Sequence, residues 1–273
     1  MSRTFEQFVR FTNDAAGLER TLRLFQSIAQ ILTSYTLPLH YLLHLQQTLT
    51  GTPTPAKTAT AVLLALRSHI GLARRYFRLF KFLESFHAAQ TLYASPGLSA
   101  AVWLDVLSRT FNGMYLLLEA STTLDALGID GLAPWGPALD RAVNVEAQRF
   151  WLFALAFGAL GGLVRIFAVF ASAGEKGAVS KEGKETGKGK GTVSDGKDGA
   201  ASDARTVVWT PAVRSKVFGL GRGVVANVLD ITLPGTVVGW VPASSGVVGL
   251  AMFVTTLLTG FDVWERCGRE VRK

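Results

Sequence analysis

The sequence contains a single cysteine, Cys267, among its 273 residues. One thiol cannot form an intramolecular disulfide, and it cannot supply the paired cysteines of a Cys-x-x-Cys metal site. A chain that faces a reducing compartment typically shows this composition. Charged side chains between Arg3 and Arg23 also interrupt any apolar segment that could serve as a secretory signal, so we expect no such signal.

The sequence also lacks the residue patterns of common enzyme active sites. None of its four histidines lies in a His-Glu-x-x-His motif or has an aspartate five residues further on, as a membrane acyltransferase would require. His40 and His44 share a helix face, but no carboxylate or thiolate is close to them in sequence, and we interpret them as interfacial side chains. The glycine-rich run 219–223 lacks the preceding strand and the acidic residue of a nucleotide-binding loop. We therefore expect no enzymatic activity, no catalytic residues, no cofactor and no metal site.

Long stretches of the chain carry few or no charges. Hydrophobic residues make up 49% of the chain and charged residues 18%, and the mean hydropathy of +0.29 is higher than that of most soluble proteins. The net charge of +8 would suit either nucleic acid or an anionic membrane. A nucleic-acid-binding domain needs a basic patch on a soluble core, whereas here a basic helix precedes long uncharged segments. We therefore expect an anionic phospholipid membrane as the partner and no nucleic acid.

The segment Phe150–Ala171 is one of two predicted transmembrane helices. About twenty apolar residues are needed to cross the hydrocarbon layer, and this run supplies them with Arg165 as its one charged residue. We expect Arg165 to extend its guanidinium group to the membrane interface. The small residues Ala159, Gly161 and Gly162 indicate close packing against another helix.

The second predicted transmembrane helix covers Ser244–Phe261, within an uncharged stretch that starts at Ile231. Trp240 and Trp264 flank this helix, as aromatic residues at a membrane interface do.

The uncharged region 24–56 is predicted not to span the membrane, because Pro38 divides it and its polar side chains would be costly in hydrocarbon. We expect a pair of buried or interfacial helices there, the first of them running over Ala15–Ser34. Thr4 and Gln7 have the spacing of a capping box and predict a short helix before it.

Cap and turn signals place two further helices. One is predicted over Leu98–Leu127, with Asp105 and Arg109 paired at i,i+4 and Gly128 as its end. Thr210–Pro211 predicts the cap and first turn of a short amphipathic helix.

The composition divides the chain into four parts. Residues 1–137 are predicted to be an amphipathic helical membrane-binding region, and residues 138–172 a helix with the first transmembrane segment. Residues 173–206 are mostly Gly, Ser, Lys, Glu and Asp, and they predict a flexible linker. Residues 207–273 hold an amphipathic helix, the second transmembrane segment and a basic tail. The predicted fold class is an all-α membrane protein, with amphipathic helices and about two transmembrane helices joined by a disordered Gly/Lys-rich linker.

The most amphipathic stretch is Leu66–Phe86. On a helical wheel of about 100° per residue, basic residues gather in one arc and apolar residues in the opposite, wider arc. A helix of this composition lies in the plane of the lipid headgroups. The residues predicted to bind lipid are Arg67, Arg74, Arg75, Phe77, Arg78, Phe80, Lys81, Leu83 and Phe86. The alternative interpretation is a surface helix packed on the protein's own core.

Three segments together resemble the peroxin-eleven family of peroxisomal membrane-elongation proteins. Residues 8–26 are similar to the family's opening, in which a short helix leads through a glycine-containing turn into an Arg/Leu helix. Residues 73–83 are similar to its basic amphipathic segment, and residues 244–252 to its closing membrane helix. The order and spacing of these segments across the chain support the match, and the resemblance is to a fungal-like member. The chain departs from the family pattern at Leu18-Glu19, where an Arg-Asp pair is common, and in its long linker.

The resemblance implies an integral protein of the peroxisomal membrane that promotes peroxisome division and proliferation, with both termini in the cytosol. It also implies the fission machinery as partners, namely a dynamin-related GTPase and its adaptor. We further expect a homo-oligomer. An amphipathic helix inserted into one leaflet would widen that leaflet alone, and so curve and elongate the membrane. Two alternatives stay open: a channel for small metabolites, in which Arg165 would line the pore, and a membrane scaffold that recruits fission factors.

Overall fold

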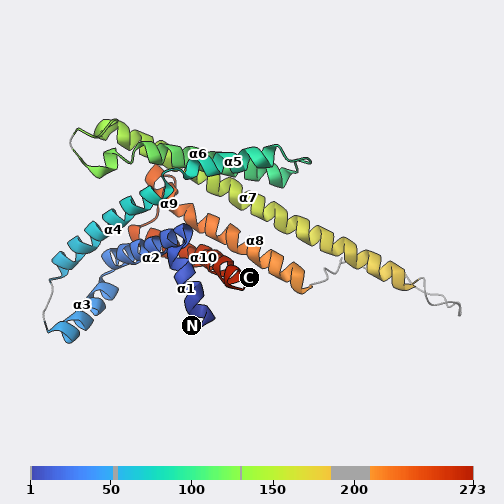
Figure 1. Cartoon of the computed structure of the whole chain (residues 1–273), viewed down its shortest axis with the longest axis horizontal. Helices are drawn as coiled ribbons and strands as arrows, with labels where there is room; N and C mark the ends of the chain where they lie inside the picture. The colour runs from blue at the N-terminus through green and yellow to red at the C-terminus, as the bar shows by residue number, and fades with distance from the viewer. Residues whose placement is uncertain (1, 52–54, 130, 186–209, 273) are drawn as a thin grey trace.

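The computed structural model describes residues 2–51, 55–129, 131–185 and 210–272 (Figure 1). Every regular element within these ranges is helical. In chain order, the elements are α1 (Arg3–Asn13), α2 (Ala15–Ser34), α3 (Thr36–Thr50), α4 (Ala56–Arg78), α5 (Lys81–Tyr93), α6 (Ala100–Ser121), η1 (Asp125–Leu127), α7 (Gly136–Glu185), α8 (Pro211–Asp230), α9 (Thr232–Val238) and α10 (Ser245–Val271).

The N-terminal helices begin at residues whose side chains satisfy the free backbone N–H groups of the first turn. The Ser2 hydroxyl accepts from the N–H of Phe5 at the start of α1, so the cap is Ser2 and not the predicted Thr4. The Asp14 carboxylate accepts from the N–H groups of Ala16 and Gly17, which confirms the predicted start of α2.

The break between α2 and α3 falls at Tyr35, three residues before the predicted break at Pro38. Tyr35 is extended, with φ −119° and ψ 123°. Pro38 lies in the first turn of α3, where its missing N–H has no helical partner to lose. A proline can therefore follow a helix break closely without causing it.

The prediction of one continuous helix over Leu66–Phe86 is wrong. α4 ends at Arg78 and α5 begins at Lys81, with Phe80 at φ −107° and ψ 7° between them. α4 packs against α2, whereas α5 packs against α6, so the chain changes direction at Leu79 and Phe80 (Figure 1). Tertiary packing overrides the local helical pattern at this point.

Seven helices of the described chain pack in a row that starts with α5 and ends with α4. α6 lies between α5 and α7, α8 lies between α7 and α10, and α2 lies between α10 and α4. Two short helices pack on members of this row: α1 packs on α10, and α9 packs on α7. α6 ends at Ser121, earlier than predicted, and the following turn η1 ends at Gly128, whose φ of 64° favours glycine.

Small residues make close helix contacts, as the sequence predicted for Ala159, Gly161 and Gly162. A Cβ atom on Gly162 would lie 2.5 Å from Cγ2 of Val224 in α8. A Cβ on Gly161 would lie 3.1 Å from a carboxylate oxygen of Asp105 in α6. α7 therefore approaches both neighbours through positions that lack a side chain.

Three helical segments of the described chain are long and apolar enough to cross a membrane: Gly136–Ser172, Pro211–Val238 and Ser245–Val271. The two predicted spans lie within the first and third of these segments. The second, formed by α8 and α9, was predicted only as a short amphipathic helix. Only 28%, 17% and 39% of their most apolar windows are buried, respectively, so most of this apolar surface faces outward, as it does toward lipid.

The predicted linker over 173–206 starts inside α7, whose backbone continues to Glu185. Its remaining part lies outside the described residues. The described chain confirms the predicted all-α class with membrane helices.

Candidate functional site

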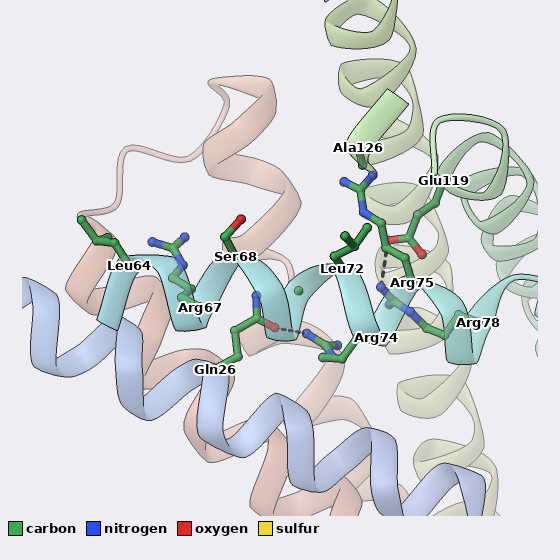
Figure 2. A pocket seen from close by; sticks show the side chains of 11 residues that line it. Gln26, Leu64, Arg67, Ser68, Leu72, Arg74, Arg75, Arg78, Glu119 and Ala126 are labelled. Carbon is green, nitrogen blue, oxygen red and sulfur yellow. Dashed lines mark hydrogen bonds and ion pairs between the residues drawn. The ribbon is translucent and has the colours of Figure 1, made fainter. Parts of the chain in front are cut away.

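Arg74, one of the predicted lipid ligands, is buried and holds α4 against α2. Its Nε and Nη2 atoms donate to Oε1 of Glu19, at 3.0 and 2.7 Å. Its Nη1 atom donates to Oε1 of Gln26, at 2.6 Å (Figure 2). The side chain of Glu19 is 7% exposed, so both charges are inside the protein. All donors of this guanidinium that face α2 are engaged, which places Arg74 in the helix packing.

The pKa of Glu19 shows how strongly the site favours its ionised form. Burial alone would raise this pKa, but the positive charges of Arg74, Arg20 and Arg78 outweigh burial and lower it to about 2. Glu19 is therefore ionised at any physiological pH, and its pairing with Arg74 persists.

Arg78, at the end of α4, makes the matching link to α6. Its Nη2 atom donates to Oε1 of Glu119 at 2.8 Å (Figure 2). The Tyr115 hydroxyl donates to the same oxygen at 2.8 Å. Burial opposes the charge of Arg78, yet Tyr115 and Glu119 hold its pKa above the usual value. Burial raises the pKa of Tyr115, which therefore keeps its proton and donates.

The other three basic residues that were predicted to bind lipid are not paired in this way. Within the described part of the chain, Arg67, Arg75 and Lys81 have no hydrogen bond or ion pair. Arg67 and Arg75 line a cavity of about 490 Å³ that runs along α4 and reaches Glu119 and Ala126. In Figure 2 both guanidinium groups point away from α2, on the open side of α4. These cations are available to a ligand.

The four apolar residues that were predicted to bind lipid also fall into two groups, one exposed and one packed. Phe77, Phe80 and Leu83 are 40%, 69% and 58% exposed, and they surround the bend between α4 and α5. We call these three residues the apolar patch. Phe86, in contrast, packs against α6, because a Cβ atom on Gly113 would lie 2.7 Å from its ring. Phe86 therefore helps to join α5 to α6.

Arg165 pairs with Asp105 across the contact between α7 and α6. The predictions that Arg165 extends to the interface and that Asp105 pairs with Arg109 are thus both replaced by one interhelical ion pair. Asp105 reaches Arg165 because the missing side chain of Gly161 lets α6 approach α7 closely. A charge inside an apolar helix is costly unless it has such a partner.

The sequence reasoning missed a buried polar cluster that joins α2, α8 and α10. Arg23 Nη2 donates to Oδ1 of Asp230 at 2.5 Å and to the Thr255 hydroxyl at 3.1 Å. Thr255 in turn donates to Asp230 at 2.6 Å. The side chains of Arg23 and Asp230 are 6% and 9% exposed. Asp230 gave the one available signal, because an acid that directly precedes the uncharged stretch 231–261 needs a partner.

Contacts between α1 and α10 bring the two ends of the chain together. Gln7 donates from Nε2 to the carbonyl of Trp264 at 2.7 Å, and Arg266 donates to Asp14 at 2.7 Å. The two termini therefore lie close together (Figure 1). Among the described residues, no group of three His, Cys, Asp or Glu side chains is placed to hold a metal ion.

Three apolar helices with mostly outward-facing apolar surface, two of which carry an ion pair to a neighbouring helix, are typical of an integral membrane protein of the all-α class. The chain belongs to the peroxisomal biogenesis factor 11 (PEX11) family, whose model matches residues 5–264. This confirms the family resemblance of the sequence. The chain has no match among the curated proteins or among the solved structures. Its family makes it a peroxisomal membrane protein that acts in peroxisome proliferation.

Proposed function

We propose that this protein curves and elongates the peroxisomal membrane by inserting the apolar patch into one leaflet. The observation that supports the proposal is the exposure of Phe77, Phe80 and Leu83 at the α4–α5 bend, beside cations that have no partner in the described chain. Water does not favour three large apolar side chains in one place, whereas the acyl region of a leaflet does.

The energies assign different roles to the two kinds of residue. Burial of each large apolar side chain contributes roughly 1.5–3 kcal/mol. Each arginine or lysine near an anionic surface contributes about 1 kcal/mol, and salt weakens this contribution. Insertion of the apolar patch therefore dominates bending, and the cations Arg67, Arg75 and Lys81 dominate recruitment. Because Arg74 and Arg78 are paired internally, they contribute to the second role less than an isolated helix would suggest.

The membrane helices keep the apolar patch at a high concentration next to the bilayer. The contact between α1 and α10 holds the two ends of the chain together, and we propose that both termini face the cytosol, as the family resemblance implies. We further propose that the protein forms homo-oligomers and that it acts, as the resemblance implies, with a dynamin-related GTPase and its adaptor.

The test replaces Phe77 and Phe80 by glutamate in the full chain. We expect this variant to reach the peroxisome through its membrane helices but to leave the organelles short and undivided. The control replaces the same residues by leucine, which keeps the apolar patch and should keep elongation near the wild-type level. Normal elongation by the glutamate variant would contradict the proposal.

A metabolite channel is the second candidate, and one observation favours it. A cavity of about 420 Å³ lies between α6, α7 and α8, and its polar lining includes Asp105, Arg165 and Asn227. If this cavity conducts, Arg165→Leu should change the conductance of the protein in planar bilayers. Substitution of the apolar patch should leave that conductance unchanged, which separates the channel from the bending activity.

A further inference from the structure

Two cavities beside α4 share three arginines in their lining. The outer cavity, of about 490 Å³, and the inner cavity, of about 420 Å³, are both lined by Gln26, Arg67, Arg74 and Arg78. Arg75 lines the outer cavity and is not part of the inner one. The inner cavity therefore adjoins the outer one along these four shared residues.

The inner cavity has an excess of positive charge. Arg74 is already hydrogen-bonded to Glu19 and Gln26, and Arg78 is hydrogen-bonded to Glu119 and Tyr115. Arg67, which is half-buried between the two cavities, has no carboxylate partner in the described chain. A cation in such a place favours an anion beside it, because surrounding protein screens their attraction less than bulk water does.

The position of the inner cavity relative to the membrane helices is the second observation. Its lining includes Gln148, Thr236 and Ser245. Gln148 precedes the apolar run of α7, Thr236 lies near the end of α9, and Ser245 is the first residue of α10. The start of the apolar run of α7, the end of the α8–α9 segment and the start of α10 therefore meet at this cavity. This is the level at which the phosphate groups of a bilayer lie.

The chemistry of the remaining wall indicates a ligand that is both charged and apolar. Next to the polar residues, the inner cavity is lined by Trp151, Leu233, Val248 and Met252. A free phosphate or a sugar phosphate would leave these apolar side chains uncovered. The first carbon atoms of an acyl chain would cover them.

We propose that the inner cavity binds one anionic phospholipid, with its phosphate group on Arg67 and the start of an acyl chain along Trp151 and Val248. Gln30 and Ser245 lie in the same lining and supply further polar partners for the headgroup. The inference rests on the membrane function proposed above, and it adds a discrete lipid site to a surface that otherwise acts by insertion. Occupancy by an anionic lipid would then join α4 to the ends of α7, α9 and α10.

The test uses the full chain purified in a neutral detergent. The probes are dioctanoyl phosphatidic acid, dioctanoyl phosphatidylcholine, glycerol 3-phosphate and inorganic phosphate. Native mass spectrometry counts bound molecules, and thermal unfolding reports the effect on stability. We expect one phosphatidic acid per chain, with saturation, and weaker binding of the other three probes. Equal binding of glycerol 3-phosphate would show a site for soluble phosphates and overturn the lipid assignment.

Matched variants on one helix locate the site. Arg67→Gln should weaken phosphatidic acid binding by about tenfold or more, since it removes a charged hydrogen bond to the phosphate. Arg67→Lys should restore part of the affinity. Lys57→Gln is the control, because Lys57 is a cation of the same helix that lines neither cavity, and the affinity of this variant should stay within about threefold of the wild type. Equal affinities of the Arg67→Gln variant and the wild type would refute the site.

The apolar-patch variant separates this inference from the proposed function. Replacing Phe77 and Phe80 by glutamate should abolish vesicle deformation and leave one phosphatidic acid bound per chain. If the patch variant still deforms vesicles while Arg67→Gln loses lipid binding, the bending mechanism fails and the lipid site stands. If Arg67→Gln retains lipid binding while the patch variant loses deformation, the site fails and the bending mechanism stands.

Discussion

The arginines of α4 form two sets that the sequence does not distinguish. Arg74 and Arg78 are held by Glu19 and Glu119 on neighbouring helices, whereas Arg67 and Arg75 face a cavity without a carboxylate partner in the described chain. All four fall in one arc of the helical wheel. The difference comes from residues far away in the sequence, and it shows that a basic face can serve helix packing and ligand binding at once.

A similar contrast separates buried and exposed ion pairs. Arg23 and Asp230 pair inside the bundle beside Thr255, where α2 meets two candidate membrane helices. Arg10 and Glu270 pair on the surface near the termini, with about half of each side chain exposed. Breaking a buried pair leaves a charge without water or a partner, whereas breaking an exposed one leaves both charges hydrated.

The largest effect is expected from Arg23→Met, which leaves Asp230 buried without its cation. We expect a loss of about 3–5 kcal/mol in the free energy of unfolding, measured in detergent micelles by thermal or denaturant unfolding. Arg10→Met is the control on the exposed pair, and its expected loss is less than about 1 kcal/mol. Similar losses for both variants would contradict the distinction between the two pairs.

The two sets of arginines on α4 should also differ in their effect on stability. Arg74→Gln removes the cation that Glu19 faces, and we expect it to cost about 2–3 kcal/mol. Arg67→Gln removes no protein contact in the described chain, and its expected cost is within about 0.5 kcal/mol. Unfolding midpoints of the two variants, measured side by side without added lipid, test this difference. A destabilised Arg67→Gln variant would mean that Arg67 belongs to the packing set.

Acid pH weakens the contact between Glu19 and Arg74, by less than the Arg74→Gln substitution does. The folded-state pKa of Glu19 is about 2, below its usual value of 4.5, so its stabilising contribution is complete above about pH 4.5 and is lost as the pH falls toward 2. We expect this contribution to fall by on the order of 1–2 kcal/mol at about pH 3.5. Denaturant unfolding between neutral and acid pH measures it, and Glu19→Gln should lack this component.

The sequence predicted the parts of the fold that depend on local pattern. The helix over Ala15–Ser34, the span in α10 and the close packing at Gly161 and Gly162 all follow from short-range composition, and the structure confirms them. The span formed by α8 and α9 was missed because glycines and three basic residues at its start lower its apolar character.

The candidate site was less predictable, for a physical reason. A helical wheel gives the direction of Arg74 from the axis of α4, but it cannot show that Glu19 of α2 faces that direction. The bend at Leu79 and Phe80 also depends on which helix each half packs against. Interhelical partners and changes of direction are properties of the tertiary structure, so pattern analysis of one segment does not contain them.

The smallest effect is expected from replacing either of two glycines in the candidate membrane helices by alanine. A methyl group on Gly162 of α7 would approach Val224 of α8 to 2.5 Å, whereas one on Gly219 would meet nothing within 4 Å. Overpacking of this kind costs roughly 1–3 kcal/mol, and alanine regains up to about 1 kcal/mol of helix propensity. We therefore expect Gly162→Ala to lower the free energy of unfolding by about 1 kcal/mol and Gly219→Ala to raise it by about 0.5 kcal/mol. If the free energy of unfolding in detergent changes in opposite directions in the two variants, the result supports a close α7–α8 contact at Gly162. If both variants were stabilised equally, the two helices would not be in close contact there.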